Sequence, residues 1–327
     1  MNYVITGSVA FDYLMTFPGC FSDFILPEKL ERLSLSFLID SLTIQHGGNA
    51  ANIAYTLALL GERPRLMATV GEDFGDYREW LESKGIDTSL TKVIPGVHTA
   101  TFFANTDRVN SQIASFYPGA MAYAGQLSFY DLDGEKPDLV TISPNDMGAM
   151  QRYVQECQEL GIAYLYDPSQ QIVRLDKHVV RKGIEGAAAF FVNDYEFDLV
   201  QKITGMTQDD VLHCVKLLVI TCGENGSLIF AAGDEIHVPI VPAKQIVDPT
   251  GVGDAFRGGF LVGYGRGWNL ELCGQMGALA ATYCLESTGP QGQSYTPAEF
   301  AARFRDHFDD HGRLDELTAS PPSIQAS

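Results

Sequence analysis

The sequence predicts an α/β fold, with a mostly parallel sheet covered by helices on both faces and a small β-sheet lid. Short β-branched runs alternate with helical patterns between residues 139 and 221, which is typical of parallel strands joined by crossover helices. The composition, 46% hydrophobic and 19% charged, suits a globular chain with a large core. Residues that directly follow predicted strands are expected to line one edge of the sheet, where ligands bind: Ser8, Asn145, Asp167, Asn193 and Gly223.

Apolar, β-branched runs bounded by turn residues predict the strands. They cover residues 3–7, 65–70, 139–142, 163–166, 189–192 and 217–221, followed by a hairpin of 226–231 and 235–241. The stretch 33–44 alternates weakly, and we expect it to pair with part of 11–18 or with 98–116 as a small antiparallel sheet. The lid would then be contributed by about residues 11–45 and 97–118.

Helical periodicity predicts the layers that cover the sheet. In the first helix Asn49 is the expected N-cap and Gly61 the expected end. The remaining helices are predicted at residues 75–84, 147–160, 175–183, 195–204, 254–266 and 270–287. No internal repeat or linker divides residues 1–308, so we predict one domain. From about Asp309 the apolar period is lost, and residues 309–327 are predicted to form a flexible tail.

Charge, cysteines and termini exclude several classes of protein. The formal net charge of −19 disfavours nucleic-acid binding, which normally needs a basic face. No apolar run reaches membrane-spanning length, and the first residues lack the segments of a signal peptide. The six cysteines are scattered without a CxxC pair, which indicates reduced thiols and not disulfides or a zinc site. We therefore expect a cytoplasmic protein with no membrane or nucleic-acid partner.

The stretch from Ile246 to Tyr264, IVDPTGVGDAFRGGFLVGY, carries the strongest candidate chemistry. Gly251 and Gly253 allow a tight turn that leads into a helix, and the unpaired N–H groups of a helix start suit a phosphate. Asp254 stands at the same place and would oppose an anion unless it had a proton to take. An anion hole beside a base is what phosphoryl transfer to a hydroxyl needs. A helix cap preceded by an ordinary turn is an equally good interpretation of this stretch alone.

Two further turns are candidates for a nucleotide and its metal. Asn193 and Glu196 share one helical face and suit Mg²⁺ held through water, although local sequence favours a capping box for the same pair. The turn from Thr221 to Gly226 would approach a nucleotide or only reverse the chain. The loop over residues 287–292 is a candidate for a monovalent cation bound through carbonyls.

Polar residues near the N-terminus are candidates for binding a sugar. Asp12 and Asn52, together with the backbone of Gly47 and Gly48, would bind adjacent hydroxyls, whereas Asp12 could also be a turn-former. Aromatic residues in the 98–118 stretch, Phe102 and Phe116, would stack on a flat base if exposed. Membership of the core of the small sheet is an equal alternative for this pair.

Three motifs, in this order and separation, resemble the paired signatures of a known family. GGNAANIA near residue 50, NDYE at 193–196 and DPTGVGDAFRGGF near 250 are similar to the ribokinase-like (PfkB) carbohydrate and nucleoside kinases over about residues 1–308. Within this family, the chain most resembles bacterial adenosine kinases of the mycobacterial type. The stretches that carry this resemblance are TGSVAFDYLMTFPGCF, LPEKLERLSLSFLID, QIASFYPGAM, DPSQQIVRL and FVNDYEFDL. The resemblance implies ATP-dependent phosphorylation of the ribose 5′-hydroxyl of adenosine, giving AMP and ADP.

The resemblance also implies roles for individual residues. Asp254 is then the general base, Gly251, Val252 and Gly253 supply the anion-hole amides, and Arg174 clamps a phosphate. The implied nucleoside contacts are Ser8, Asp12, Ser36, Gly48, Asn52, Phe102, Phe116 and Gln170. The implied ATP and cation contacts are Asn193, Thr221, Gly223 and Gly226 for ATP, Asn193 and Glu196 for Mg²⁺ through water, and Asp248 and Thr250 for part of a K⁺ site.

Other functions stay open. A ribokinase-like kinase for another nucleoside is one alternative, and a ribokinase-like kinase for a free sugar is a second, which would need a polar pocket where Phe102 and Phe116 would stack a base. A catalytically silent nucleoside-binding module is disfavoured by the intact set of Asp254, Asn193 and Glu196. A dinucleotide dehydrogenase is disfavoured because no GxGxxG follows the first strand. A homodimer through the lid is expected, since pairing two lids would cover their strand edges.

Overall fold

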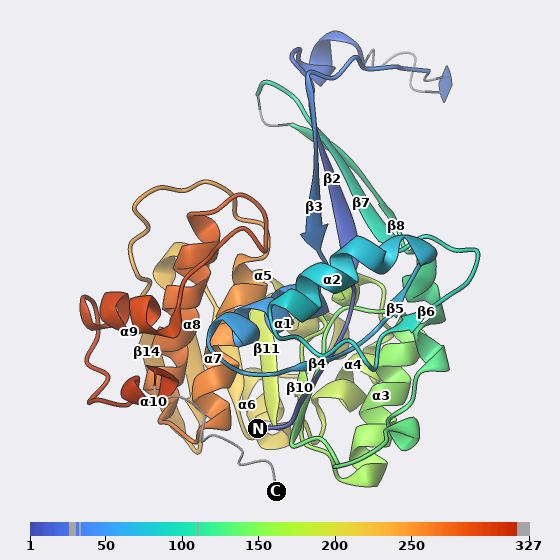
Figure 1. Cartoon of the computed structure of the whole chain (residues 1–327). Helices are drawn as coiled ribbons and strands as arrows, with labels where there is room; N and C mark the ends of the chain where they lie inside the picture. Colours follow the sequence, from blue (N-terminus) through green and yellow to red (C-terminus); the bar gives the residue numbers. More distant parts are fainter. Residues whose placement is uncertain (26–30, 33, 110, 319–327) are drawn as a thin grey trace, which may run out of the picture.

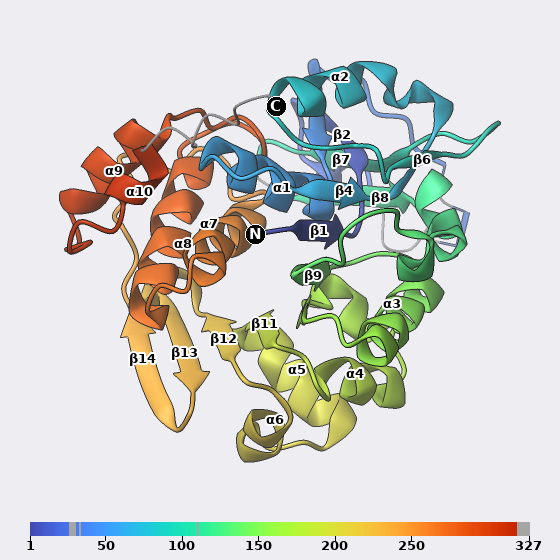
Figure 2. The same cartoon turned by 60° about the horizontal axis from the view of Figure 1, so that its bottom comes forward.

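The structure is a computed structural model that describes residues 1–25, 31–32, 34–109 and 111–318, and an eight-stranded sheet lies at its centre (Figures 1 and 2). The strand order is β4 (Arg65–Met67), β1 (Tyr3–Thr6), β9 (Leu139–Ile142), β10 (Tyr164–Tyr166), β11 (Ala189–Asn193), β12 (Leu218–Thr221), β13 (Ser227–Ala231) and β14 (Asp234–Val238). Strand β13 pairs antiparallel with both β12 and β14, and all other neighbours are parallel. This confirms the predicted mostly parallel sheet.

Helices cover both faces of the sheet, and each face has its own hydrophobic core (Figure 2). Successive residues of β1 point to opposite faces, so Tyr3 and Ile5 enter one core and Val4 the other. The first core is covered by α1 (Asn49–Leu59), α2 (Gly75–Ser83), α7 (Val252–Gly265), α8 (Leu270–Leu285), α9 (Pro297–Arg305) and α10 (Asp315–Thr318). The second is covered by α3 (Met147–Leu160), α4 (Lys177–Ile184), α5 (Asp194–Thr204) and α6 (Gln208–Cys214). In the described part of the chain, no helix has the length and apolarity to cross a membrane.

A second sheet of four strands, called the small sheet below, projects from this body (Figure 1). Its order is β3 (Ser41–Gly47), β2 (Ala10–Thr16), β7 (Ala100–Thr106) and β8 (Gln112–Tyr117). It corresponds to the predicted lid, and the expected antiparallel pairing with part of 11–18 is confirmed by the pairing of β3 with β2, but the sheet as a whole is not antiparallel. Strands β2 and β7 are parallel because both begin at the body, where Ala10 pairs with Ala100. Strand β3 begins only at Ser41, so residues 34–40 of the predicted strand lie outside it.

Two local predictions in the body need correction. Residues 65–70 form β4 and the separate β5 (Thr69–Val70), which pairs with β6 (Lys92–Val93). The N-cap of α1 is Gly48, not Asn49, whose side chain is bonded elsewhere.

The predicted tail was wrong for residues 309–318. Arg305 forms an ion pair with Asp310 at 2.8 Å, and Leu314 is completely buried. One ion pair and one buried apolar side chain therefore hold this segment against α9, although its sequence has no regular apolar period. The rest of the predicted tail, 319–327, lies outside the described residues.

Candidate active site

The turn before α7 forms as the glycine pattern predicts. Gly251 is the N-cap with a left-handed φ of 79°, and a Cβ there would clash with Pro290. Only glycine satisfies both demands. Among the described residues the amides of Gly251 and Gly253 have no protein acceptor, and that of Val252 makes only a 3.4 Å contact with the carbonyl of Pro249. The start of α7 therefore offers free N–H groups to an anion.

Asp254 lies in the first turn of α7 and is 5% exposed. Its Oδ1 accepts a hydrogen bond from Asn49 Nδ2 at 3.0 Å, and its Oδ2 accepts one from Asn52 Nδ2 at 2.9 Å. Burial raises the pKa of Asp254, whereas Arg257 and the two amides oppose the increase. A raised pKa makes a carboxylate a stronger base, as proton abstraction from a hydroxyl requires.

Close packing of two helices brings these amides to Asp254. Gly258 of α7 faces Thr56 of α1, where a Cβ would come within 2.6 Å of the threonine Cβ. Ser8, after β1, fixes the start of α1, because its Oγ accepts from the Asn49 amide at 3.0 Å and lies 3.2 Å from Asn49 Oδ1. The small residue at Gly258 thus has a direct role in placing the site.

Arg257 is a site residue that sequence analysis missed. Its Nε lies 2.6 Å from Asp167 Oδ2, and its Nη2 donates to Asp167 Oδ1 at 2.7 Å. Its Nη1 lies 2.8 Å from the position of a Cβ on Gly253, so the cation faces the same turn as the free amides. Burial disfavours the charged form, yet the pKa of Arg257 is raised because Asp167 and Asp254 lie beside it. The spacing of one helical turn from Asp254 was the available signal.

The predicted sugar-binding residues come together beside α1. Gly48 has a φ of 96°, and a Cβ there would lie 2.5 Å from the carbonyl oxygen of Ser8. The carboxylate of Asp12 faces Gly47 and is nearly buried, with 7% exposure. Burial raises the pKa of Asp12 to about 7, with further contributions from Asp248 and Asp254. Asp12 is therefore a strand residue of β2 facing the site, and not a turn-former.

Phe102 and Phe116 are register partners on β7 and β8, and Phe102 is also the partner of Asp12. Because register partners share a face of a sheet, both rings lie on the face that carries Asp12. Phe102 is half-buried and Phe116 is 47% exposed, so Phe116 is not a core residue of the small sheet. The arrangement leaves both rings available for stacking on a flat group.

Two other residues that are predicted to contact the base, Ser36 and Gln170, do not lie beside Phe102 and Phe116. Ser36 is exposed in the segment before β3, and Figure 1 places that segment at the far end of the small sheet. Gln170 is exposed after β10, where its Oε1 accepts from Ser169 Oγ at 2.7 Å. Their contact with a base stays a prediction that would need the small sheet to move.

Asn193 and Glu196 form the capping box that local sequence favours. Asn193 Oδ1 accepts from the Glu196 amide at 2.7 Å, and Glu196 Oε2 accepts from the Asn193 amide at 2.9 Å. The second carboxylate oxygen of Glu196 lies 3.2 Å from Ser169 Oγ and is not used in the cap. The charge of Glu196 acts to raise the pKa of both Asp254 and Asp167, so Glu196 lies near these two carboxyls.

The turn after β12 has the backbone that its glycines require. Gly223 and Gly226 have φ of 56° and 82°, and a Cβ on Gly226 would clash with the carbonyl of Val238. Thr221 Oγ1 lies 3.5 Å from the carbonyl of Val192. These contacts explain the turn without a nucleotide, so the ATP role stays a prediction. Arg174 is exposed, and its phosphate role stays a prediction too.

Asp248 binds the loop that follows α8. Its Oδ1 accepts from the Thr250 amide at 2.9 Å and its Oδ2 from the Gly289 amide at 3.0 Å. The carbonyl of Thr250 lies 3.4 Å from Cys284 Sγ. Of the two predicted cation ligands, Asp248 therefore joins the turn before α7 to the loop 287–292, and Thr250 lies against α8. Within the described ranges, no group of three or more His, Cys, Asp or Glu side chains is arranged to hold a metal.

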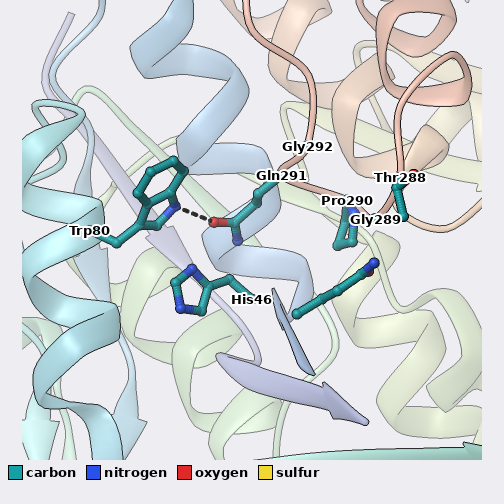
Figure 3. Close-up of a pocket in the computed structure, with 8 residues that line it drawn as sticks. His46, Trp80, Thr288, Gly289, Pro290, Gln291 and Gly292 are labelled. Carbon is teal, nitrogen blue, oxygen red and sulfur yellow. Dashed lines mark hydrogen bonds between the residues drawn. The ribbon is translucent and has the colours of Figure 1, made fainter. Parts of the chain in front are cut away.

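A cavity of about 130 Å³ lies beside this loop, and Figure 3 shows the side chains around it. On one side Trp80 Nε1 donates to Gln291 Oε1 at 3.2 Å, and His46 lies next to this pair. Sequence analysis did not single out Trp80, and it considered Gln291 only as part of the loop 287–292; the two residues are 211 positions apart in the chain. The lining residues are Gln45, His46, Trp80, Thr288, Gly289, Pro290, Gln291 and Gly292.

Comparison with known proteins agrees with this geometry. Residues 9–297 match the pfkB family of carbohydrate kinases. A nucleoside kinase of Methanocaldococcus jannaschii is 30% identical over 305 residues, which cover 92% of this chain and 96% of that protein. The resemblance to adenosine kinases in particular is finer than these matches, which concern the family and nucleoside kinases in general.

Two solved structures share the fold. The nucleoside kinase of Burkholderia thailandensis in complex with inosine has a TM-score of 0.84 and 34% identity, covering 94% of this chain and 98% of that one. Its complex with ADP and inosine has a TM-score of 0.82 and 35% identity, covering 94% and 96%. The family match spans most of the sequence and includes both the GGN segment and the turn before Asp254. The chain belongs to the pfkB family of carbohydrate kinases.

Proposed function

We propose that the chain is a nucleoside kinase that transfers the γ-phosphoryl group of ATP to the ribose 5′-hydroxyl of adenosine, giving AMP and ADP. The main observation that supports this proposal is that Asp254 is buried, is held by the side-chain amides of Asn49 and Asn52, and lies directly beside the free N–H groups of Gly251 and Gly253. A base next to an anion hole suits phosphoryl transfer to a hydroxyl. The relatives described as nucleoside kinases support a nucleoside as the acceptor.

In the proposed reaction, Asp254 takes the proton of the 5′-hydroxyl as that oxygen attacks the γ-phosphorus in line. The bond between the γ-phosphorus and the β–γ bridging oxygen breaks, and ADP leaves. The amides of Gly251 and Gly253 and the guanidinium of Arg257 stabilise charge on the group in transfer. Asp12 and the second N–H of Asn52 bind ribose hydroxyls, and closure of the small sheet excludes water.

The residues near the ATP side fit a magnesium ion held through water. Glu196 has one carboxylate oxygen outside its capping box, and hard oxygen ligands are those that Mg²⁺ prefers. When bound with ATP, Mg²⁺ neutralises charge on the β- and γ-phosphates. We also propose K⁺ at the carboxylate of Asp248 and the carbonyl of Thr250, which replacement of K⁺ by Na⁺ in the assay would test.

Inosine is the second candidate acceptor, because the kinase of Burkholderia thailandensis was solved with inosine at 34% identity. Both purines present a flat face for Phe102 and Phe116, so stacking alone does not separate them. A free sugar is less well supported, since Phe116 would offer an aromatic face where a sugar kinase needs polar groups.

Coupled ADP release with Mg-ATP tests the proposal against adenosine, inosine, guanosine, ribose and fructose 6-phosphate. Turnover on adenosine, with ribose orders of magnitude worse, is the expected result. Turnover on inosine alone would move the assignment to the second candidate, and turnover on a sugar alone would discard the base contacts. Absence of turnover with all five, with adenosine still bound, would favour the silent binding module.

The Asp254→Asn variant tests the base. We expect turnover to fall by at least about 10²-fold while affinity for ATP stays close to that of the wild type, because only the proton acceptor is lost. Near-wild-type turnover would remove Asp254 from this role.

We further propose that two copies associate through the small sheet. The face opposite Asp12 carries exposed apolar side chains, and β3 and β8 are open edges. The apolar residues of this face are Leu42, Ile44, Phe103, Ile113 and Tyr117, each at least 39% exposed. Sedimentation analysis should show a dimer that Ile44→Asp converts to a monomer. A monomeric wild type at micromolar concentration would contradict the proposal.

A further inference from the structure

A chain of hydrogen bonds links α2 to Asp254 through two buried amides. Trp80 Nε1 donates to Gln291 Oε1 at 3.2 Å, as Figure 3 shows, and Gln291 Nε2 donates to Asn52 Oδ1 at 3.0 Å. Asn52 Nδ2 then donates to Asp254 Oδ2 at 2.9 Å. Gln291 is 7% exposed and Asn52 is 5% exposed, so water does not substitute freely for any of these partners.

The direction of this chain is set at its outer end. An indole N–H can only donate, so the atom of Gln291 that faces Trp80 must be the amide oxygen. Tyr77 requires the same orientation of the Gln291 amide. Its hydroxyl donates to the carbonyl of Gly47 at 2.9 Å, so it accepts a hydrogen bond from Gln291 Nε2. Two independent contacts therefore leave Gln291 one orientation, with its nitrogen toward Asn52.

We propose that Gln291 is a positioning residue, which holds the amide of Asn52 with its nitrogen toward Asp254 through a hydrogen-bond chain that begins at the indole of Trp80. The inference rests on the proposed function, in which Asp254 is the general base. If Asn52 turned over, its carbonyl oxygen would face the carboxylate of Asp254, and one of the two donors to the base would become a repulsive contact.

Donation from Asn52 favours the ionised form of Asp254. Other charges also act on this carboxyl, and none of them is part of the chain of amides. The titratable groups around Asp254 are Arg257 on α7, Asp167 after β10, Glu196 on α5, Asp12 on β2, Asp248 before α7 and Cys284 on α8. The variants proposed below leave all of these groups in place, so a change in the pH profile reports on the amide chain.

The test is the pH profile of kcat/KM for the nucleoside at saturating Mg-ATP. In Gln291→Met, a similar volume without a donor, the acidic limb should move up by about one pH unit, the size expected from a lost hydrogen bond to a charged group. Trp80→Phe keeps an aromatic ring but removes the N–H, and should move the limb in the same direction by less, since Tyr77 still orients Gln291. The double variant should match Gln291→Met alone, because both changes act on one chain.

Trp268→Phe is the matched control, because its indole donates to Glu316 at 3.3 Å and belongs to no site contact described above. Its acidic limb should coincide with that of the wild type. A merely structural role of Gln291 would lower kcat/KM at every pH without moving the limb, and that result would overturn the inference. The inference would also be overturned if the acidic limb of the double variant moved by the sum of the shifts of the two single variants.

The Asp254→Asn variant separates the two levels of the proposal. If Asp254→Asn keeps near-wild-type turnover, Asp254 is not the general base, and the proposed function fails in that respect. If Asp254→Asn is inactive while the limbs of Gln291→Met and Trp80→Phe coincide with that of the wild type, only the positioning role of Gln291 fails. Should Gln291→Met not fold, the upward shift in Trp80→Phe remains the deciding measurement.

Discussion

Replacing Asp12 by asparagine is expected to stabilise the ligand-free protein at alkaline pH while weakening nucleoside binding. Asp12 is 7% exposed on β2. Burial, with the nearby carboxylates of Asp248 and Asp254, raises its pKa from the ordinary 3.8 to about 7. The ionised carboxylate is therefore a cost to the fold that the protein retains for binding, as functional sites often do.

The sign and size of this effect follow from the two pKa values. Because the folded-state pKa is raised, folding favours the protonated carboxyl, and the penalty is fully present only above about pH 7. The penalty decreases as the pH falls and is gone below the ordinary value of 3.8. The difference between the two values corresponds to about 4 kcal/mol, an upper bound. For 327 residues this is a change in Tm on the order of 5 °C.

Thermal and urea unfolding of wild type and Asp12→Asn at pH 8 and pH 4.5 measure the effect. The variant should be the more stable protein at pH 8, and the gap should narrow at pH 4.5, while the KM for the nucleoside rises. A variant that is less stable at pH 8, or a gap that does not depend on pH, would refute the reasoning.

Asp107→Asn, in the turn directly after β7, is the matched control, with the opposite sign. Although burial acts against it, hydrogen bonds from the backbone amides of Phe21, Ser111 and Val109 lower the pKa of Asp107. Its ionised form therefore stabilises the fold, and this contribution is lost as the pH falls through the lowered pKa. Asp107→Asn should be destabilised at pH 8, where Asp12→Asn is stabilised.

Four further outcomes are expected. Arg257→Met leaves the carboxylate of Asp167 buried and unpaired, and should lower the free energy of unfolding by about 3–5 kcal/mol in urea titrations, with recovery in the double variant with Asp167→Asn. Leu314→Ala should cost about 2–5 kcal/mol by the same measurement, whereas a flexible tail would give no change. Asn52→Ala should raise the KM for the nucleoside in steady-state assays, and an effect confined to ATP would contradict the ribose contact. Phe116→Ala should raise the KM for purine nucleosides about tenfold if the ring supplies about 1.4 kcal/mol of stacking; an unchanged KM would remove it from the site.

The sequence by itself determined the alternation of strands and helices, the turn before α7 and the capping box at Asn193. These features obey rules that act over a few residues: the φ of 79° that Gly251 adopts, the spacing of cap and carboxylate, and apolar periodicity. The family resemblance added roles that no local rule contains, and the placement of Asp254 beside free amides agrees with them.

The tertiary structure decided how distant side chains meet. Asp254 receives its two amides from residues 205 and 202 positions away, and Trp80 reaches Gln291 across 211 positions. Arg257 finds Asp167 across 90 positions, and the parallel pairing of β2 with β7 depends on where both strands leave the body. No local pattern encodes these contacts, because each joins elements that are far apart in the sequence. The chemistry of the site can therefore be predicted from the sequence, whereas the contacts that set the pKa and orientation of Asp254 exist only in the folded chain.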